Sequence, residues 1–130
     1  MNLDPLMKID RLKKHYPVRW SFFGRALAHV KAVDGISLTV NMGETLSVVG
    51  ESGCGKTTLG RCLLNLEEPT AGVIYFEGRN LRAYPPAEMR QLRRHMQMIF
   101  QDPYSSLNPR KTVSRIIGDA FCIHDMLSKK

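Results

Sequence analysis

The sequence has 130 residues, 43% of them hydrophobic, and a formal net charge of +7 at pH 7. It is long enough for one domain with a hydrophobic core. No apolar run approaches the roughly 18 residues of a membrane-spanning helix, and charged residues break up the amino-terminal stretch, which excludes a secretory signal. Three unpatterned cysteines argue against a disulfide framework or a zinc site. We therefore expect a cytosolic protein.

The excess of positive charge favours an anionic partner, and charge alone leaves nucleotide, nucleic acid and an acidic membrane surface open. The basic residues form loose clusters instead of one block. Each cluster by itself is more typical of a solvated face than of a binding site. The clusters are Arg11, Lys13 and Lys14; Arg19, Arg25 and Lys31; and Arg90, Arg93 and Arg94.

The first predicted elements form a small antiparallel sheet. A strand is expected from Met7 to Leu12, ended before Pro17, which lacks the N–H that a ladder needs. The aromatic and basic stretch from Val18 to Lys31 favours an irregular hairpin whose rings cover the sheet; docking on a membrane or a partner is the alternative. Apolar and polar residues alternate from Ile36 to Val40, as in a half-buried strand. A turn at Asn41 to Glu44 follows.

The next stretch fits a phosphate-binding loop. Residues Gly50 to Thr57 read Gly-Glu-Ser-Gly-Cys-Gly-Lys-Thr and match G-x-x-x-x-G-K-[ST]. The apolar run Thr45 to Val49 before it predicts a buried parallel strand. After it, the spacing of Leu59, Cys62, Leu63 and Leu66 predicts a helix. Such a loop wraps a polyphosphate with backbone N–H groups, Lys56 reaching the β- and γ-phosphates and the Thr57 hydroxyl binding Mg²⁺.

Further elements follow the loop helix. That helix is expected to end near Asn65 to Glu68, before Pro69. The later predictions are a strand at Val73 to Phe76, a helix at Ala87 to His95, a strand at Met96 to Phe100 and a helix from Val113 towards Met126. The apolar face of the last helix has no later element to pack on, so we expect the sequence to stop inside a larger domain.

Three stretches together resemble the ATP-binding subunits of ABC transporters. More narrowly, they resemble the ATP-binding subunits of dipeptide, oligopeptide and nickel importers. The resemblance covers nearly the whole sequence but only the first half of such a subunit. It implies an α/β fold, namely a P-loop NTPase core with an amino-terminal antiparallel β subdomain, truncated where a helical subdomain starts. Residues 1–110 would be the incomplete ATP-binding core and 111–130 the start of the helical subdomain. The matching stretches are Lys13 to Val18, Val49 to Arg61 and Phe100 to Arg110.

The resemblance also implies roles for single residues. Tyr16 would be the aromatic ring that stacks on adenine; from the residues alone, a tyrosine packed on its own sheet explains it equally well. Gln101 would be the Q-loop glutamine that touches Mg²⁺ and the attacking water and senses the membrane subunit; without the family it would be a loop-capping residue. The four histidines, His124 included, are expected to be structural or exposed. The Walker A loop would bind ATP through Gly50, Ser52, Gly53, Cys54, Gly55, Lys56, Thr57 and Thr58.

The family's signature motif, Walker B carboxylates and switch histidine are missing from these residues. We therefore expect an ATP-binding subunit of a peptide or nickel importer that binds Mg-ATP and does not hydrolyse it alone. Its expected partners are membrane permease subunits, a second ATP-binding subunit (identical or different) and, indirectly, a substrate-binding protein, at the inner face of the cell membrane. The alternatives are a truncated nucleotide-binding fragment without turnover and a cytosolic ABC protein acting on nucleic acid, which the stretch from Phe100 to Arg110 disfavours.

Overall fold

The computed structural model describes residues 5–20, 26–102 and 107–123, without the side chains of 19–20 and 26–27. The described chain divides into two compact units, residues 1–85 and 86–130. This division differs from the expected boundary at 110/111, which stays a prediction. The first unit contains the sheet and the phosphate loop.

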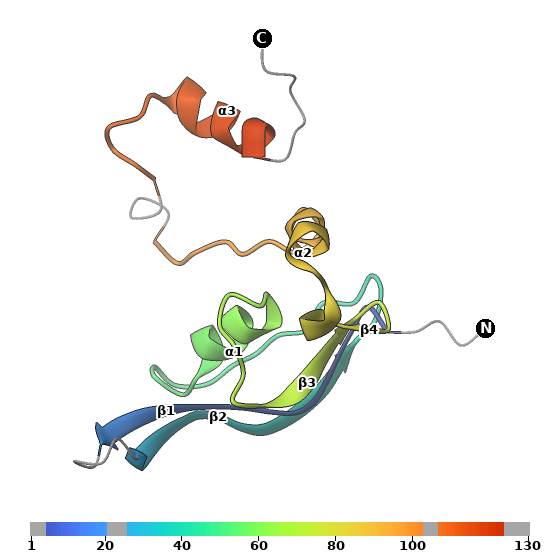
Figure 1. Cartoon of the computed structure of the whole chain (residues 1–130), viewed down its shortest axis with the longest axis vertical. Helices are drawn as coiled ribbons and strands as arrows, with labels where there is room; N and C mark the ends of the chain where they lie inside the picture. The colour runs from blue at the N-terminus through green and yellow to red at the C-terminus, as the bar shows by residue number, and fades with distance from the viewer. Residues whose placement is uncertain (1–4, 21–25, 103–106, 124–130) are drawn as a thin grey trace. The chain divides into compact units, whose positions relative to one another are not determined.

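The sheet of the first unit has four antiparallel strands in the order β2-β1-β3-β4. Strands β1 (Met7–Trp20) and β2 (Ala26–Val40) form the long hairpin, and β3 (Ala71–Phe76) and β4 (Arg79–Asn80) form a short one (Figure 1). The segments on either side of the predicted irregular hairpin therefore pair as antiparallel strands; its aromatic rings lie outside the described side chains, so their covering of the sheet stays a prediction.

Strand β1 does not end before Pro17, as the sequence predicted, but continues to Trp20 with Pro17 opposite His29. The reason is that β3 pairs with β1 only as far as Lys13. Beyond that residue one side of β1 is a sheet edge, where a residue without an N–H is tolerated.

A β-bulge at Arg11 sets which side chains of β1 face the core. Arg11 has a φ of 45°, and the pairing of β1 shifts between Ile9 and Leu12. Ile9 and Leu12 are three positions apart, which in a regular strand places them on opposite faces; the bulge brings both into the core, at 2% and 0% exposure. The Ser37 hydroxyl accepts a hydrogen bond of 2.8 Å from the Arg11 N–H, which satisfies the bulged backbone.

Helix α1 (Lys56–Leu63) follows the phosphate loop and lies against one face of the sheet (Figure 1). Leu59 and Cys62 of its predicted apolar face are buried, whereas Leu66 is exposed. The helix ends at Leu63, earlier than predicted, because Asn65 takes a left-handed φ of 50°. The N–H of Asn65 then bonds to the Cys62 carbonyl, and the N–H of Leu66 bonds to the Arg61 carbonyl. This is the pattern of a Schellman cap.

Two predicted strands are wrong. Residues 45–49 and 96–100 form no strand, and Val48, Val49 and Ile99 are 49%, 88% and 96% exposed. A strand exists only where a neighbouring backbone completes its hydrogen bonds. Within the described ranges no other segment pairs with either stretch.

The remaining elements are short helices. A 3₁₀ turn, η1 (Leu81–Ala83), closes the first unit. The second unit contains α2 (Pro86–Leu92) and α3 (Val113–Ile123). Helix α2 ends three residues before the predicted His95, because the N–H groups of Arg94 and His95 bond to carbonyls three residues back. Helix α3 forms as predicted up to Ile123, with Val113, Ile117 and Phe121 exposed; its expected continuation to Met126 lies outside the described residues.

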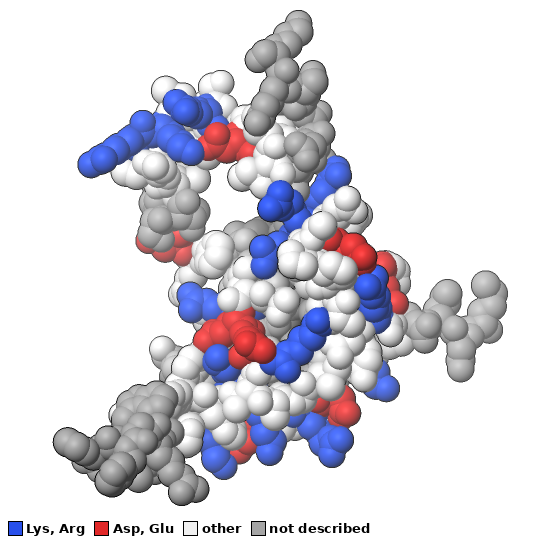
Figure 2. All heavy atoms as spheres, viewed as in Figure 1, with Lys and Arg blue, Asp and Glu red and all other residues white. Residues whose placement is uncertain are grey.

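Charged residues of both signs are interspersed on the one face that Figure 2 shows. On the face shown in Figure 2, Lys and Arg lie among Asp and Glu without forming one continuous basic patch. In the described part of the chain, no helix is long and apolar enough to cross a membrane.

Candidate functional site: the phosphate loop

The loop from Gly50 to Gly55 is exposed for most of its length and leads directly into α1. Gly55 is the N-cap of the helix and has a φ of 99°. A Cβ atom at this position would collide with the carbonyl oxygen of Ala32 in β2. Glycine is therefore required there by both the backbone conformation and the close approach of the loop to the sheet.

The Lys56 side chain folds back into the loop. Its ammonium group donates hydrogen bonds to the carbonyl oxygens of Gly50 and Glu51, at 2.8 and 2.6 Å, and lies 3.5 Å from the Cys54 sulfur. These acceptors are neutral. A phosphate oxygen carries negative charge and forms a stronger bond with an ammonium group, so an arriving polyphosphate can replace them.

The start of α1 offers backbone donors. The N-cap residue of this helix is a glycine, so no side chain caps the helix start. The first N–H groups of α1 therefore stay available to an anion, which the helix dipole also attracts. Thr57 is exposed and Thr58 half-buried in the first turn. The loop therefore fits a polyphosphate group.

The described residues hold no cluster of three or more His, Cys, Asp and Glu side chains suited to a metal ion. The exposed Thr57 hydroxyl fits Mg²⁺ as one ligand, since this ion keeps several waters and takes phosphate oxygens together with a few protein groups. Gln101 is exposed and belongs to the second unit. Its assignment to the metal and to the attacking water stays a prediction.

Tyr16 lies on β1, and its hydroxyl donates a hydrogen bond to the Glu67 carboxylate. This bond and partial burial raise the pKa of Tyr16 above its usual 10.0, while a hydrogen bond with the Thr58 side chain acts in the opposite direction. The ring is thus next to the first turn of α1, beside the predicted Walker A residues. Its stacking on adenine stays a prediction.

Sequence reasoning did not identify Glu67 or the part that Lys14 plays beside it. The Lys14 ammonium lies 3.5 Å from Glu67 and 4.9 Å from the centre of the Tyr16 ring. No local pattern distinguishes Glu67 from an ordinary exposed loop carboxylate, because its partners lie about 50 positions earlier in the chain.

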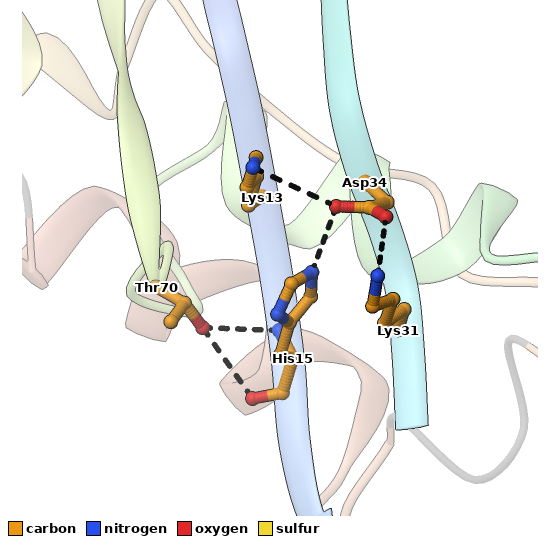
Figure 3. Close-up of polar contacts among 5 residues, drawn as sticks. All are labelled: Lys13, His15, Lys31, Asp34 and Thr70. Atoms are coloured by element: carbon orange, nitrogen blue, oxygen red, sulfur yellow. Dashed lines mark hydrogen bonds and ion pairs between the residues drawn. The ribbon is translucent and has the colours of Figure 1, made fainter. Parts of the chain in front are cut away.

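The histidines expected to be structural or exposed differ in their environments. His15 contacts Asp34 at 3.0 Å on the neighbouring strand, and Lys13 and Lys31 face the same carboxylate (Figure 3). The backbone N–H of His15 donates to the Thr70 hydroxyl at 3.0 Å. His29 and His95 are exposed, and His124 lies outside the described residues.

Comparison with known proteins identifies the family. The protein-family model described as ABC transporter matches residues 33–129. The chain is 43% identical over 130 residues to the oligopeptide transport ATP-binding protein AppF of Bacillus subtilis, and 47% identical over 126 residues to the dipeptide transport ATP-binding protein DppF of Escherichia coli. These alignments cover 99% and 97% of this chain but only 40% and 37% of the relatives. The predicted resemblance to peptide-importer subunits is thereby confirmed.

Solved structures agree on the fold. A dimeric ATP-binding cassette described in a post-hydrolysis state with ADP and Pi matches with a TM-score of 0.75 and 21% identity. The match covers 95% of this chain and 50% of that one. The α/β fold class predicted from the sequence is confirmed at the level of the cassette, although the two segments named above are not paired as strands. On the evidence of its family match and its relatives, this chain belongs to the ABC transporter family.

Proposed function

We propose that the protein binds Mg-ATP through residues 50–58 as the ATP-binding part of a peptide or nickel importer. The observation that carries this proposal is the Lys56 ammonium held inside an exposed glycine loop, next to an uncapped helix start. In that position Lys56 would neutralise the β- and γ-phosphates, and the backbone N–H groups would hold their oxygens. Thr57 would contribute a hydroxyl to the metal ion that accompanies the nucleotide.

The test is binding of a fluorescent ATP analogue to the full 130-residue chain and to Lys56→Ala. We expect the substitution to weaken binding by about tenfold or more, because a charged partner of the phosphates is removed. Lys8→Ala, an exposed lysine on β1, is the matched control and should bind like the unchanged chain. Equal affinity of Lys56→Ala and the unchanged chain would contradict the phosphate-loop assignment.

The proposed partners are membrane permease subunits and a second ATP-binding subunit, at the cytoplasmic face of the membrane. Support comes from the similarity to proteins named as oligopeptide and dipeptide transport ATP-binding proteins. Co-purification with permease subunits that persists at high salt is the expected result.

Action on nucleic acid is the weaker candidate, suggested by the net charge of +7. The mixture of both signs on the face in Figure 2 does not favour it. Affinity for RNA or DNA that falls steeply with salt would support it instead, because counterion release accompanies phosphate binding.

A further inference from the structure

We infer that Glu67 and Lys14 are positioning residues that hold the Tyr16 ring beside the nucleotide site and so set affinity for the base, not for the phosphates. This inference rests on the proposed ATP binding and on the predicted stacking of Tyr16 on adenine. It assigns to two charged side chains a role in recognising the nucleoside part of the ligand.

The three side chains form one connected group. The Tyr16 hydroxyl donates to a Glu67 oxygen, and the Lys14 ammonium lies 3.5 Å from that same oxygen. Lys14 also donates to the Glu68 carbonyl at 2.9 Å. The Lys14 and Glu67 side chains are 16% and 21% exposed, against 45% and 41% for Lys13 and Asp34. The group is therefore more enclosed than that neighbouring surface ion pair, and its geometry is better determined.

Backbone contacts fix Glu67 relative to the phosphate loop. The N–H of Glu67 bonds to the Arg61 carbonyl at 3.3 Å, as part of the turn that ends α1. Helix α1 begins at Lys56. A hydrogen bond from Tyr16 to Glu67 thus ties the ring to the turn that ends this helix, whose start would face the phosphates.

The Lys14 ammonium restricts the ring as well. At 4.9 Å from the ring centre it makes a cation–π contact. Lys14 and Tyr16 are two positions apart on β1, and both side chains contact the same Glu67 oxygen, so they lie on the same face of the sheet. With its hydroxyl bonded and a cation over one face of the ring, Tyr16 loses little additional rotational freedom when a base stacks on the other face, which favours binding.

A purely structural role for the group predicts a different result. If Glu67 only joined the hairpin to α1, its loss would affect every ligand of the loop equally. If it positions the ring, its loss should affect ligands that carry a base and spare those that do not. ATP and inorganic tripolyphosphate separate the two cases.

The experiment measures dissociation constants of both ligands, with Mg²⁺, for the full chain and four variants. We expect Glu67→Ala to weaken ATP binding about threefold to tenfold and to leave tripolyphosphate within about twofold. Glu67→Gln, which keeps an acceptor for the tyrosine hydroxyl, should restore most of the loss. Tyr16→Ala should weaken ATP at least as much as Glu67→Ala. Glu68→Ala, whose side chain is 79% exposed, is the matched control and should change neither ligand.

Equal weakening of both ligands in Glu67→Ala, or unchanged ATP affinity, would overturn this inference while the phosphate loop stands. Absence of saturable binding of either ligand to the unchanged chain would overturn the proposed function and the inference with it. The Glu67→Gln variant controls for a folding defect in Glu67→Ala. If Glu67→Gln unfolds at the same temperature as the unchanged chain but binds ATP as weakly as Glu67→Ala, the hydrogen bond from Tyr16 does not set affinity for the base.

Discussion

Two cysteines close together in the sequence have opposite exposure. Cys54 lies in the phosphate loop and is exposed, whereas Cys62 lies on the buried face of α1 and is fully buried. Burial raises the pKa of the Cys62 thiol, with the Glu67 charge adding to the effect. The reactive thiolate is therefore disfavoured at Cys62 and access to it is blocked.

We expect a thiol reagent to modify Cys54 and Cys122 in the native chain and to spare Cys62. Saturating Mg-ATP should protect Cys54, because its sulfur lies next to the Lys56 ammonium, and leave the rate at Cys122 unchanged. Peptide mapping by mass spectrometry measures each site. Unprotected labelling of Cys54 would show that this residue is not at the nucleotide site.

The environment of Asp34 predicts an acid-sensitive contribution to stability. Lys31 first, and then His15, hold the pKa of the Asp34 carboxyl below its usual 3.8. A group with a lowered folded-state pKa contributes stability that is fully present above its unfolded pKa and is lost as the pH falls through the folded pKa. The cluster in Figure 3 should therefore stabilise the hairpin fully above pH 3.8, and this contribution should be lost as the pH falls from there through the lower folded-state pKa of Asp34.

Asp34→Asn should lower the urea midpoint at about pH 6 and lower it by less at about pH 3, where part of the charge contribution is already lost. Circular dichroism at both pH values measures the difference. An equal decrease of the urea midpoint at both pH values would mean that Asp34 stabilises the chain through packing and not through its charge.

At the scale of elements, Gly72 fixes how β3 lies against the bulge of β1. Its φ is 88°, and a Cβ atom would lie 2.5 Å from the Arg11 carbonyl oxygen and 2.6 Å from the Leu12 Cα. Both neighbours are backbone, which cannot move without disturbing the pairing of the two strands. The bulge that brings Leu12 into the core thus requires a glycine on the adjacent strand.

Gly72→Ala should destabilise the chain by about 2 kcal/mol or more, through strain and collision together. Gly35→Ala is the matched control, because Gly35 has a φ of 78° but no atom within 4 Å of its Cβ position. Gly35→Ala should lower the free energy of unfolding by only about 1–2 kcal/mol, because it adds the strain of a left-handed backbone without a collision. Urea denaturation compares the two, and equal losses would mean that the strands adjust to remove the collision.

At the scale of the whole molecule, we predict that the phosphate loop does not support hydrolysis by itself, because the family resemblance implies further carboxylates for that step. We expect the 130-residue chain to bind Mg-ATP and to release no phosphate above the background of Lys56→Ala. A malachite green assay measures release. Turnover that needs Mg²⁺ and disappears in Lys56→Ala would show that the chain hydrolyses ATP by itself.

The sequence alone was enough to predict the helix that starts at Lys56 and the antiparallel amino-terminal strands, whereas phosphate binding by the loop stays a prediction. These depend on local properties: glycines at defined spacing, apolar periodicity and turn residues. Family resemblance added roles for Tyr16 and Gln101, which the structure leaves as predictions. The sequence predicted the loop residues as a group. The structure adds that the Lys56 side chain folds back onto the loop and bonds to the Gly50 and Glu51 carbonyl oxygens.

The tertiary structure decided what depends on distant parts of the chain. The strands predicted at 45–49 and 96–100 did not form, because apolar character alone does not supply a hydrogen-bonding neighbour. The bulge at Arg11 breaks the regular alternation of buried and exposed side chains along β1. Strand β1 continues past Pro17 because its pairing with β3 reaches only to Lys13. The contact between Tyr16 and Glu67 joins residues 51 positions apart. Sequence patterns report local conformation, but such contacts exist only once the hairpin and α1 have packed together.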